Sequence, residues 1–272
     1  MNKFVLSLSL TLALLCPALA YADAIADAVA DENRPLTQRN RDEYRHPQQT
    51  LRFFDVQPAM AVAEISPGGA WYGNILAPLL KTKGTYYAAH FYIDKDSNPY
   101  FKKSLEGFIQ QTKINPAYQS TKVTAFHPTK ALDFAPAGSL DRVLTFRNIH
   151  NWYMQHGEEG VKNAFAAFFK ALKPGGVLGV VEHRLPESMS DDKQESSGYM
   201  KQSYVIKMAQ KAGFTLLAQS DINQNTSDNA DHEKGVWTLP PRLALGEKDQ
   251  ARYLAIGESN RMTLKFVKAA AM

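Results

Sequence analysis

The sequence has a single cysteine, Cys16, close to its beginning. No cysteine follows it, so the rest of the chain can form no disulfide, no cysteine nucleophile and no thiolate metal site. A chain without thiols suits an oxidising compartment, where a free thiol is a chemical liability.

Long apolar runs and runs of like charge are also missing after residue 22. Lys and Arg are scattered among Asp and Glu, with a formal net charge of +4 and an isoelectric point of about 8.9. No basic stripe predicts a nucleic-acid partner. No later segment is apolar and long enough to span a bilayer. We therefore expect neither nucleic acid nor a membrane span once the first segment is removed.

Three catalytic patterns are absent as well. There is no Gly-x-Gly-x-x-Gly dinucleotide fingerprint, which argues against a nicotinamide or flavin site of that type. The missing Gly-x-Ser-x-Gly elbow argues against a hydrolase. No His-x-x-x-His pair supports a dedicated metal site, so we predict no metal ligand.

The first 22 residues have the features of a cleaved signal peptide. Lys3 gives a positive start, residues 4–15 are apolar, and small residues offer cleavage after Ala20 or Ala22. We therefore predict export to the bacterial periplasm or secretion. Residues 23–57 read as an N-terminal helical extension, beginning with a frayed helix or exposed leader, and residues 58–272 as one α/β domain.

From residue 58 on, strand-like and helix-like segments alternate. Apolar strands are expected at residues 62–65, 85–90, 123–126, 143–146, 177–181, 214–219 and 262–267. Helices are expected at residues 71–80, 103–111, 161–172 and 199–212. This alternation predicts a mostly parallel sheet covered by helices.

The richest stretch is residues 61–74, which read as a short strand, a tight turn and a helix. Small residues in such a turn let the backbone approach a ligand closely, and the helix start offers free N–H groups. Glu64, near the strand end, can accept from a ribose hydroxyl or an amino group. The turn is built from Ser66, Pro67, Gly68, Gly69 and Ala70, followed by Trp71.

Polar side chains also gather after two later strands, where open α/β sheets bind their ligands. Those after residue 146 are Arg147, Asn148, His150 and Asn151, and those after residue 181 are Glu182 and His183. We interpret them as a pocket floor. The alternative, that they cap the next helix while Trp152 and Tyr153 pack in the core, stays open.

Two parts of the chain resemble class I S-adenosylmethionine-dependent methyltransferases. Residues 64–70, Glu-x-Ser-x-Gly-x-Ala, resemble motif I, Glu/Asp-x-Gly-x-Gly-x-Gly, with Ser66 and Ala70 where that pattern has glycine. Leu172-Lys-Pro-Gly-Gly176 before an apolar strand resembles a frequent later motif. Residues 39–47, 145–152, 176–184 and 257–262 resemble a group of exported bacterial proteins described as predicted methyltransferases.

The resemblance implies a Rossmann-like sandwich with a mostly parallel seven-stranded sheet and an antiparallel last strand. It implies S-adenosylmethionine as cofactor and a small-molecule acceptor. The implied cofactor contacts are Glu64, Ser66, Pro67, Gly68, Gly69, Ala70, Trp71, His90, Asp94, Asp133 and Arg147. The candidate catalytic residues are Asn148, His150, Asn151, Glu182 and His183.

Among these, His150 is the candidate base, with Glu182 or His183 as alternates. At the end of the second strand the family pattern has an acidic residue that holds the ribose, whereas this chain has His90 there, with Asp94 further on. That difference keeps a second hypothesis open, a periplasmic binding protein that uses the same scaffold for a small polar ligand without turnover.

Overall fold

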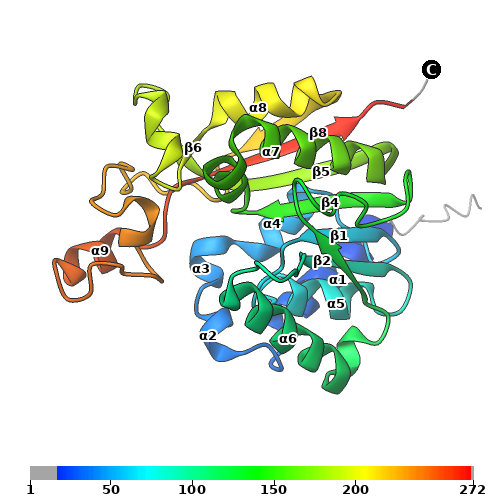
Figure 1. Cartoon of the computed structure of the whole chain (residues 1–272). Helices are drawn as coiled ribbons and strands as arrows, with labels where there is room; N and C mark the ends of the chain where they lie inside the picture. The colour runs from blue at the N-terminus through cyan, green and yellow to red at the C-terminus, as the bar shows by residue number, and fades with distance from the viewer. Residues whose placement is uncertain (1–16, 271–272) are drawn as a thin grey trace, which may run out of the picture.

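The computed structural model describes residues 17–270, which form one α/β sandwich (Figure 1). Residues 1–16, which carry most of the predicted signal peptide, lie outside the described residues. The helices are α1 (Pro17–Ala30), α2 (Leu36–Arg39), α3 (Asp42–Arg45), α4 (Pro47–Phe53), α5 (Gly73–Leu80), α6 (Pro99–Ile114), α7 (Ile149–Ala171), α8 (Gln202–Lys211) and α9 (Gln250–Ile256). Short 3-10 turns are η1 (Pro116–Tyr118), η2 (Asp191–Glu195) and η3 (Gly235–Thr238).

The strands are β1 (Ala61–Ile65), β2 (Thr85–Phe91), β3 (Lys122–Phe126), β4 (Leu140–Phe146), β5 (Leu172–Leu185), β6 (Met200–Lys201), β7 (Phe214–Ser220) and β8 (Arg261–Lys268). Their order in the sheet is β3-β2-β1-β4-β5-β8-β7. The first five strands run parallel, and β8 lies antiparallel to both β5 and β7. This is the predicted sheet with its antiparallel last strand, and the two-residue strand β6 adds an eighth strand beside β5.

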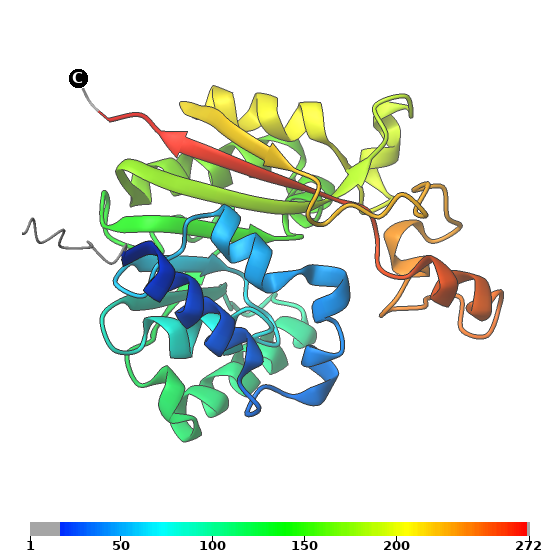
Figure 2. The ribbon, with the colours of Figure 1, turned by 180° about the vertical axis from the view of Figure 1, so that it is seen from behind.

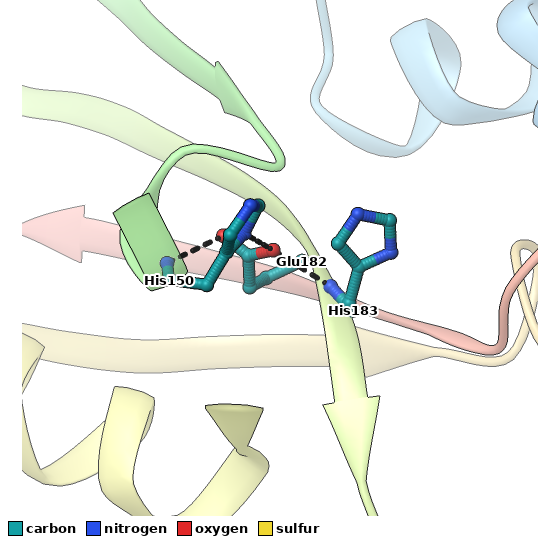
Figure 3. Close-up of side chains that lie close together, drawn as sticks. All are labelled: His150, Glu182 and His183. Atoms are coloured by element: carbon teal, nitrogen blue, oxygen red, sulfur yellow. Dashed lines mark hydrogen bonds and ion pairs between the residues drawn. The ribbon is translucent and has the colours of Figure 1, made fainter. Parts of the chain in front are cut away.

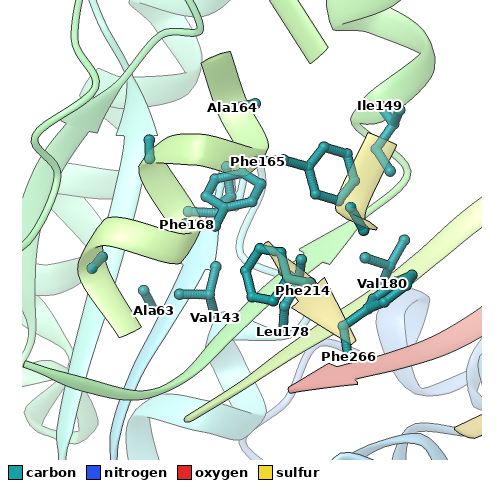
Figure 4. Close-up of a cluster of buried hydrophobic side chains, with 14 of the residues drawn as sticks. Ala63, Val143, Ile149, Ala164, Phe165, Phe168, Leu178, Val180, Phe214 and Phe266 are labelled. Carbon is teal, nitrogen blue, oxygen red and sulfur yellow. The ribbon is translucent and has the colours of Figure 1, made fainter. Parts of the chain in front are cut away.

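One face of the sheet packs against α7 and α8. Alternate strand residues such as Ala63, Val143 and Val180 point to this side, where they meet the aromatic rings of Phe165 and Phe168 (Figure 4). The period of two along each strand delivers these side chains to one face. Their burial is the main stabilising term for this layer.

The opposite face packs against α1, α4 and α5 (Figure 2). Val62 and Leu144, the neighbours of the residues that face α7, point to this side. Gly179 on β5 lets Phe54 lie directly on the sheet, because a Cβ at that position would sit 2.8 Å from the Phe54 ring. Helices on both faces are what a parallel sheet requires.

The N-terminal helix corrects one expectation. Residues 23–35 were expected to form a frayed helix or an exposed leader, but α1 packs against α4 and α5. Ile25 is 2% exposed and Ala28 is 7% exposed. The alternation of alanine with polar residues hides a narrow apolar stripe of small side chains, which sequence periodicity detects poorly.

The carboxyl ends of the parallel strands lie level. Ile65 at the end of β1 pairs with Ala89 on one side and with Thr145 on the other. Figure 1 shows α2, α3 and α9 gathered at this end of the sheet. The segment between β7 and β8, which includes η3 and α9, also lies there. In residues 17–270, no helix is both long and apolar enough to cross a membrane.

Candidate functional site

A cleft of about 1110 Å³ opens at the carboxyl ends of the parallel strands. Seven parts of the chain line it. They are the α2–α3 segment, the turn after β1, the segment from the end of β2 into α6, the segment after β3, the first turns of α7 with the turn that precedes them, His183 on β5, and the segment between β7 and β8. Of the residues predicted from sequence, those that line the cleft are Ser66, Pro67, Gly68, Gly69, Trp71, Asp94, Arg147, Asn148, His150, Asn151 and His183. Glu64, Ala70, His90, Asp133 and Glu182 are not among its lining residues.

The turn after β1 has three residues with left-handed backbone, although two of them are not glycine. The φ angles are 51° at Ser66, 56° at Gly68 and 59° at Ala70. This left-handed region costs a residue with a Cβ on the order of 1 kcal/mol. Ser66 and Ala70 therefore stand where the motif has glycine and still adopt a backbone conformation that glycine favours. At Gly69, a Cβ would meet no atom within 4 Å, so the turn presents an open backbone surface to the cleft.

His90 lies beneath this turn. Its Nδ1 accepts a hydrogen bond from the backbone N–H of Phe91 at 2.8 Å, so its Nε2 carries the proton and donates to the carbonyl of Gly68 at 3.2 Å. Burial lowers the pKa of His90 to about 4. The ring is therefore neutral near pH 7 and holds the turn in place.

The acidic candidates lie in three different environments. Glu64 is buried and accepts a hydrogen bond from the Tyr86 hydroxyl at 2.6 Å. Burial raises the pKa of Glu64 to about 7. Asp94 lies on the cleft wall, where hydrogen bonds from Lys130 and Ser97 hold its pKa at about 2. Asp133 is exposed, and its carboxylate pairs with Lys170 at 2.6 Å.

His150 and Glu182 form a buried pair at the start of α7 (Figure 3). Nδ1 of His150 lies 2.9 Å from Oε1 of Glu182. The same carboxylate accepts the backbone N–H groups of Ile149 at 2.6 Å and His183 at 2.8 Å. An ionised carboxylate only accepts, so Nδ1 of His150 is the donor and Nε2 is left as the basic nitrogen.

Glu182, and not a residue of the helix itself, therefore caps α7. Asn148 is the N-cap residue but makes no capping bond with its side chain. Its amide instead donates to the carbonyl of Ile65 at 2.9 Å, which ties this turn to the end of β1. The cap explains why α7 begins at Ile149, well before the predicted start at residue 161, with a kink at Gly157. Trp152 is buried and packs in the core beside Phe126.

His183 completes this corner of the cleft. Its Nδ1 lies 2.5 Å from the Ser259 hydroxyl, and its ring centroid lies 5.2 Å from that of His150. Burial lowers the pKa of His183 well below its ordinary value, and the nearby positive charges lower it further. His150, Glu182 and His183 offer ligand atoms within 4.8 Å of one another. Because Glu182 already accepts from several donors, a metal there would have to displace its hydrogen bonds.

Four arginines meet across the cleft, three of them from the two ends of the chain and the fourth, Arg147, from the turn between β4 and α7. Arg41 and Arg45 from the α2–α3 region pair with Glu258 at 2.5 and 3.3 Å, and Arg261 pairs with the same carboxylate. Burial alone would raise the pKa of Glu258, but Arg261, Arg45 and Arg41 outweigh it and hold that pKa at about 2. Arg45 also lies over the Trp71 ring, 4.5 Å from its centroid. We call Arg41, Arg45, Arg147 and Arg261 the arginine cluster.

Comparison with solved structures identifies the architecture, whereas comparison of sequences finds no relative. No family model matches the chain, and its sequence matches no curated protein. A SAM dependent methyltransferase from Aquifex aeolicus matches at a TM-score of 0.53 and 12% identity, over 91% of this chain and 98% of that chain. The cyclase SpnF matches at 0.58 and 13% identity, over 94% and 96%. The chain has the class I methyltransferase fold.

A possible exported protein from Bordetella parapertussis is also similar in fold to this chain. It matches at a TM-score of 0.52 and 14% identity, over 92% of this chain and 80% of that chain. Since neighbours on this fold include both methyltransferases and a cyclase, the fold alone does not decide the reaction.

The sequence did not reveal the charged residues that form the wall of the cleft opposite His150. Arg41, Arg45, Glu258 and Arg261 were given no role, although residues 39–47 and 257–262 were singled out for their resemblance. The sequence held a signal, since both stretches are dense in charged residues around small or aromatic ones. Nothing local showed that they meet, because more than 200 residues separate them.

Proposed function

We propose that this protein is an S-adenosylmethionine-dependent methyltransferase that acts on a small molecule. The observation that carries the proposal is the make-up of one cleft. A glycine-type turn with an open backbone surface borders it on one side, and an oriented histidine–carboxylate pair borders it on another. The turn suits a methyl donor, and the histidine–carboxylate pair suits an acceptor that must lose a proton.

The residues of the turn fit the methyl donor. Ser66 to Gly69 would lie against it, because all four line the cleft and a Cβ at Gly69 would meet no atom within 4 Å. Asp94, ionised on the cleft wall, would accept from the ribose hydroxyls in place of the acidic residue that His90 replaces. When bound, the donor supplies an electrophilic methyl group on a sulfonium. The rest of the catalysis is positioning and proton removal.

His150 would remove that proton. Glu182 fixes Nδ1 of His150 as a donor, which leaves Nε2 to accept a proton from the acceptor's nucleophile. The buried carboxylate also stabilises the imidazolium that forms. Asn148 and Asn151 flank the base on the same turn. The amide of Asn151, and the amide oxygen of Asn148, whose NH2 group is already bound to Ile65 and Thr145, can orient the acceptor.

We also assign the protein to the exported bacterial group that its sequence resembles. Support comes from where the four resembling stretches lie. Residues 39–47 and 257–262 supply three members of the arginine cluster with Glu258, and residues 145–152 and 176–184 supply Arg147 and the His150–Glu182 pair. Stretches that are distant in sequence thus converge on one cleft.

Calorimetric titration with S-adenosylmethionine and S-adenosylhomocysteine tests the proposal. We expect micromolar binding that Gly69→Val abolishes, because the new side chain would occupy open cleft space without straining the fold. Gly107→Val is the matched control, since a Cβ there also meets nothing within 4 Å and Gly107 does not line the cleft. Absence of binding in the folded protein would refute the methyltransferase. Binding without transfer to any acceptor would support the ligand-binding hypothesis.

Export to the periplasm, or secretion, is the second part of the proposal. The predicted cleavage sites after Ala20 and Ala22 lie within α1, upstream of Ile25 and Ala28, its buried residues. Cleavage at either site therefore leaves the packed part of α1 intact. Mass spectrometry of the N-terminus of the exported protein should show a first residue of Tyr21 or Asp23. An intact Met1 would contradict it.

A further inference from the structure

The arginine cluster carries more positive charge than its surroundings neutralise. Its four guanidinium groups line the cleft, and Glu258 pairs with three of them, those of Arg41, Arg45 and Arg261. Asp94, another acid of the cleft wall, is already paired with Lys130 at 2.6 Å. Desolvated positive charge without a matching anion is costly, so this part of the cleft is built to receive a negative group.

Arg147 is the member of the cluster without an acceptor. Among residues 17–270, its guanidinium makes no hydrogen bond or ion pair, although its five N–H groups are donors only. Its backbone is held in the left-handed region, with φ at 62°, and its N–H donates to the carbonyl of Val181 at 2.7 Å. A strained backbone that presents an unpaired guanidinium to a cleft is typical of a binding residue.

Arg147 also lies beside the proposed base. It precedes His150 by three residues on the turn from β4 into α7. After burial and His150, the charges of Arg147, Arg261 and Arg45 lower the pKa of His183, whose ring is 5.2 Å from that of His150. The guanidinium groups therefore act on the same corner of the cleft as the histidine–carboxylate pair. An anion held there would place the rest of its molecule at the base.

We propose that the methyl acceptor carries an acidic group, a carboxylate or a phosphate, and that Arg147 binds it with Arg45 and Arg261. This inference rests on the proposed function. The other source of a carboxylate is the methyl donor itself. The donor also carries an ammonium and a sulfonium, so its net charge is positive and the cluster would repel it overall. An anionic acceptor offsets part of the positive charge of both the cluster and the donor.

Titration of the protein saturated with S-adenosylhomocysteine tests this directly. The probes are benzoate, phenyl phosphate and the neutral benzamide. We expect at least one anion to bind, and benzamide to bind at least tenfold more weakly. Arg147→Asn should weaken anion binding tenfold or more, because asparagine tolerates the left-handed backbone but lacks the charge. Arg147→Lys, which keeps the charge but not the planar fork, should lose less.

Three controls separate the outcomes. Arg252→Gln removes a positive charge outside the cleft and should leave anion binding unchanged. Affinity for S-adenosylhomocysteine and for 5′-methylthioadenosine, which lacks the amino-acid part, should stay within twofold in Arg147→Asn. If only the first falls, Arg147 binds the donor's carboxylate and the inference is wrong. Equal binding of benzamide, or no anion binding, would also overturn it.

If the proposed methyltransferase function is wrong, the titrations give a different pattern from the one expected if only the acidic-acceptor proposal is wrong. If S-adenosylhomocysteine does not bind at all, the same anion titration is performed on the unloaded protein. Anion binding that depends on Arg147 would then keep the acidic-ligand site while the methyltransferase is abandoned. Loss of both would reject the two proposals together.

Discussion

Glu182 is fully buried, yet each of its carboxylate oxygens has donors around it. Two of these donors are backbone N–H groups at the start of α7, and another is the His150 ring. Such a carboxylate is held by its own hydrogen bonds and cannot drift away from the ring that it orients. His150 is thereby presented to the cleft in one tautomer, which is the requirement for a base that acts on each turnover.

Substitution of His150 tests this role. We expect His150→Ala to lower turnover by about 10²- to 10⁴-fold, the usual contribution of a general base. Affinity for S-adenosylhomocysteine should change little, because the ring borders the acceptor side. Glu182→Gln should also lower turnover, since an amide can no longer fix the donor at Nδ1. The measurement is methyl transfer with any acceptor that supports turnover, and an unchanged rate in His150→Ala would remove it from the mechanism.

The raised pKa of Glu64 predicts that the free energy of unfolding depends on pH. Its pKa is about 7 in the folded protein against 4.5 ordinarily. The unfolded chain therefore ionises first as the pH rises, and the folded state loses stability from pH 4.5 up through 7. Glu64→Gln removes this loss. The variant should equal the wild type near pH 4 and exceed it by up to about 3 kcal/mol at pH 8.

Urea unfolding at both pH values measures that difference. Glutamine can still accept from the Tyr86 hydroxyl, so the substitution removes the titrating group but keeps the hydrogen bond. Glu106→Gln, on the exposed side of α6, is the control and should show no such pH dependence. A constant difference between Glu64→Gln and the wild type across the range would show that Glu64 does not titrate with a raised pKa.

At the scale of elements, the close contact between β5 and the end of α4 depends on a glycine, Gly179, which has no side chain to keep Phe54 away from the sheet. Gly179→Ala would place a Cβ 2.8 Å from both Phe54 and Leu144, which leaves no room without movement. We expect a loss of about 1–3 kcal/mol in the free energy of unfolding, the usual cost of overpacking. Gly107→Ala, in open space on α6, should instead stabilise by about 1 kcal/mol through helix propensity. Chemical denaturation of both variants decides whether the clash is real.

The elements themselves were largely predictable because their signals are local. Each of the seven strands expected from apolar runs is present, and the turn after β1 was recognised from its small residues. The start of α7 was predicted 12 residues too late, because its cap comes from Glu182 on β5. The left-handed backbone at Ser66 and Ala70 was also hidden, since neither residue type prefers it.

For the whole molecule, the cleft exists because the two ends of the chain meet. Arg41 and Arg45 lie 217 and 213 residues before Glu258, and no local pattern joins them. Sequence reasoning therefore located the strand ends, including Arg147 and His150, but not the charged wall opposite them. Only the folded chain shows that a single carboxylate serves three guanidinium groups from both termini.

Loss of that carboxylate should affect the whole molecule. Glu258→Gln would leave Arg41, Arg45 and Arg261 without a counter-charge, and the loss of one partner from a buried ion pair typically costs about 3–5 kcal/mol. The exposed pair of Glu233 with Lys248 is the contrast, because Glu233→Gln should cost at most about 1 kcal/mol. Thermal unfolding in low and high salt measures both, and added chloride or sulfate should restore part of the loss in Glu258→Gln by screening the arginines. If Glu258→Gln costs no more than Glu233→Gln, the arginines do not depend on this carboxylate, and another interaction holds the two ends of the chain together.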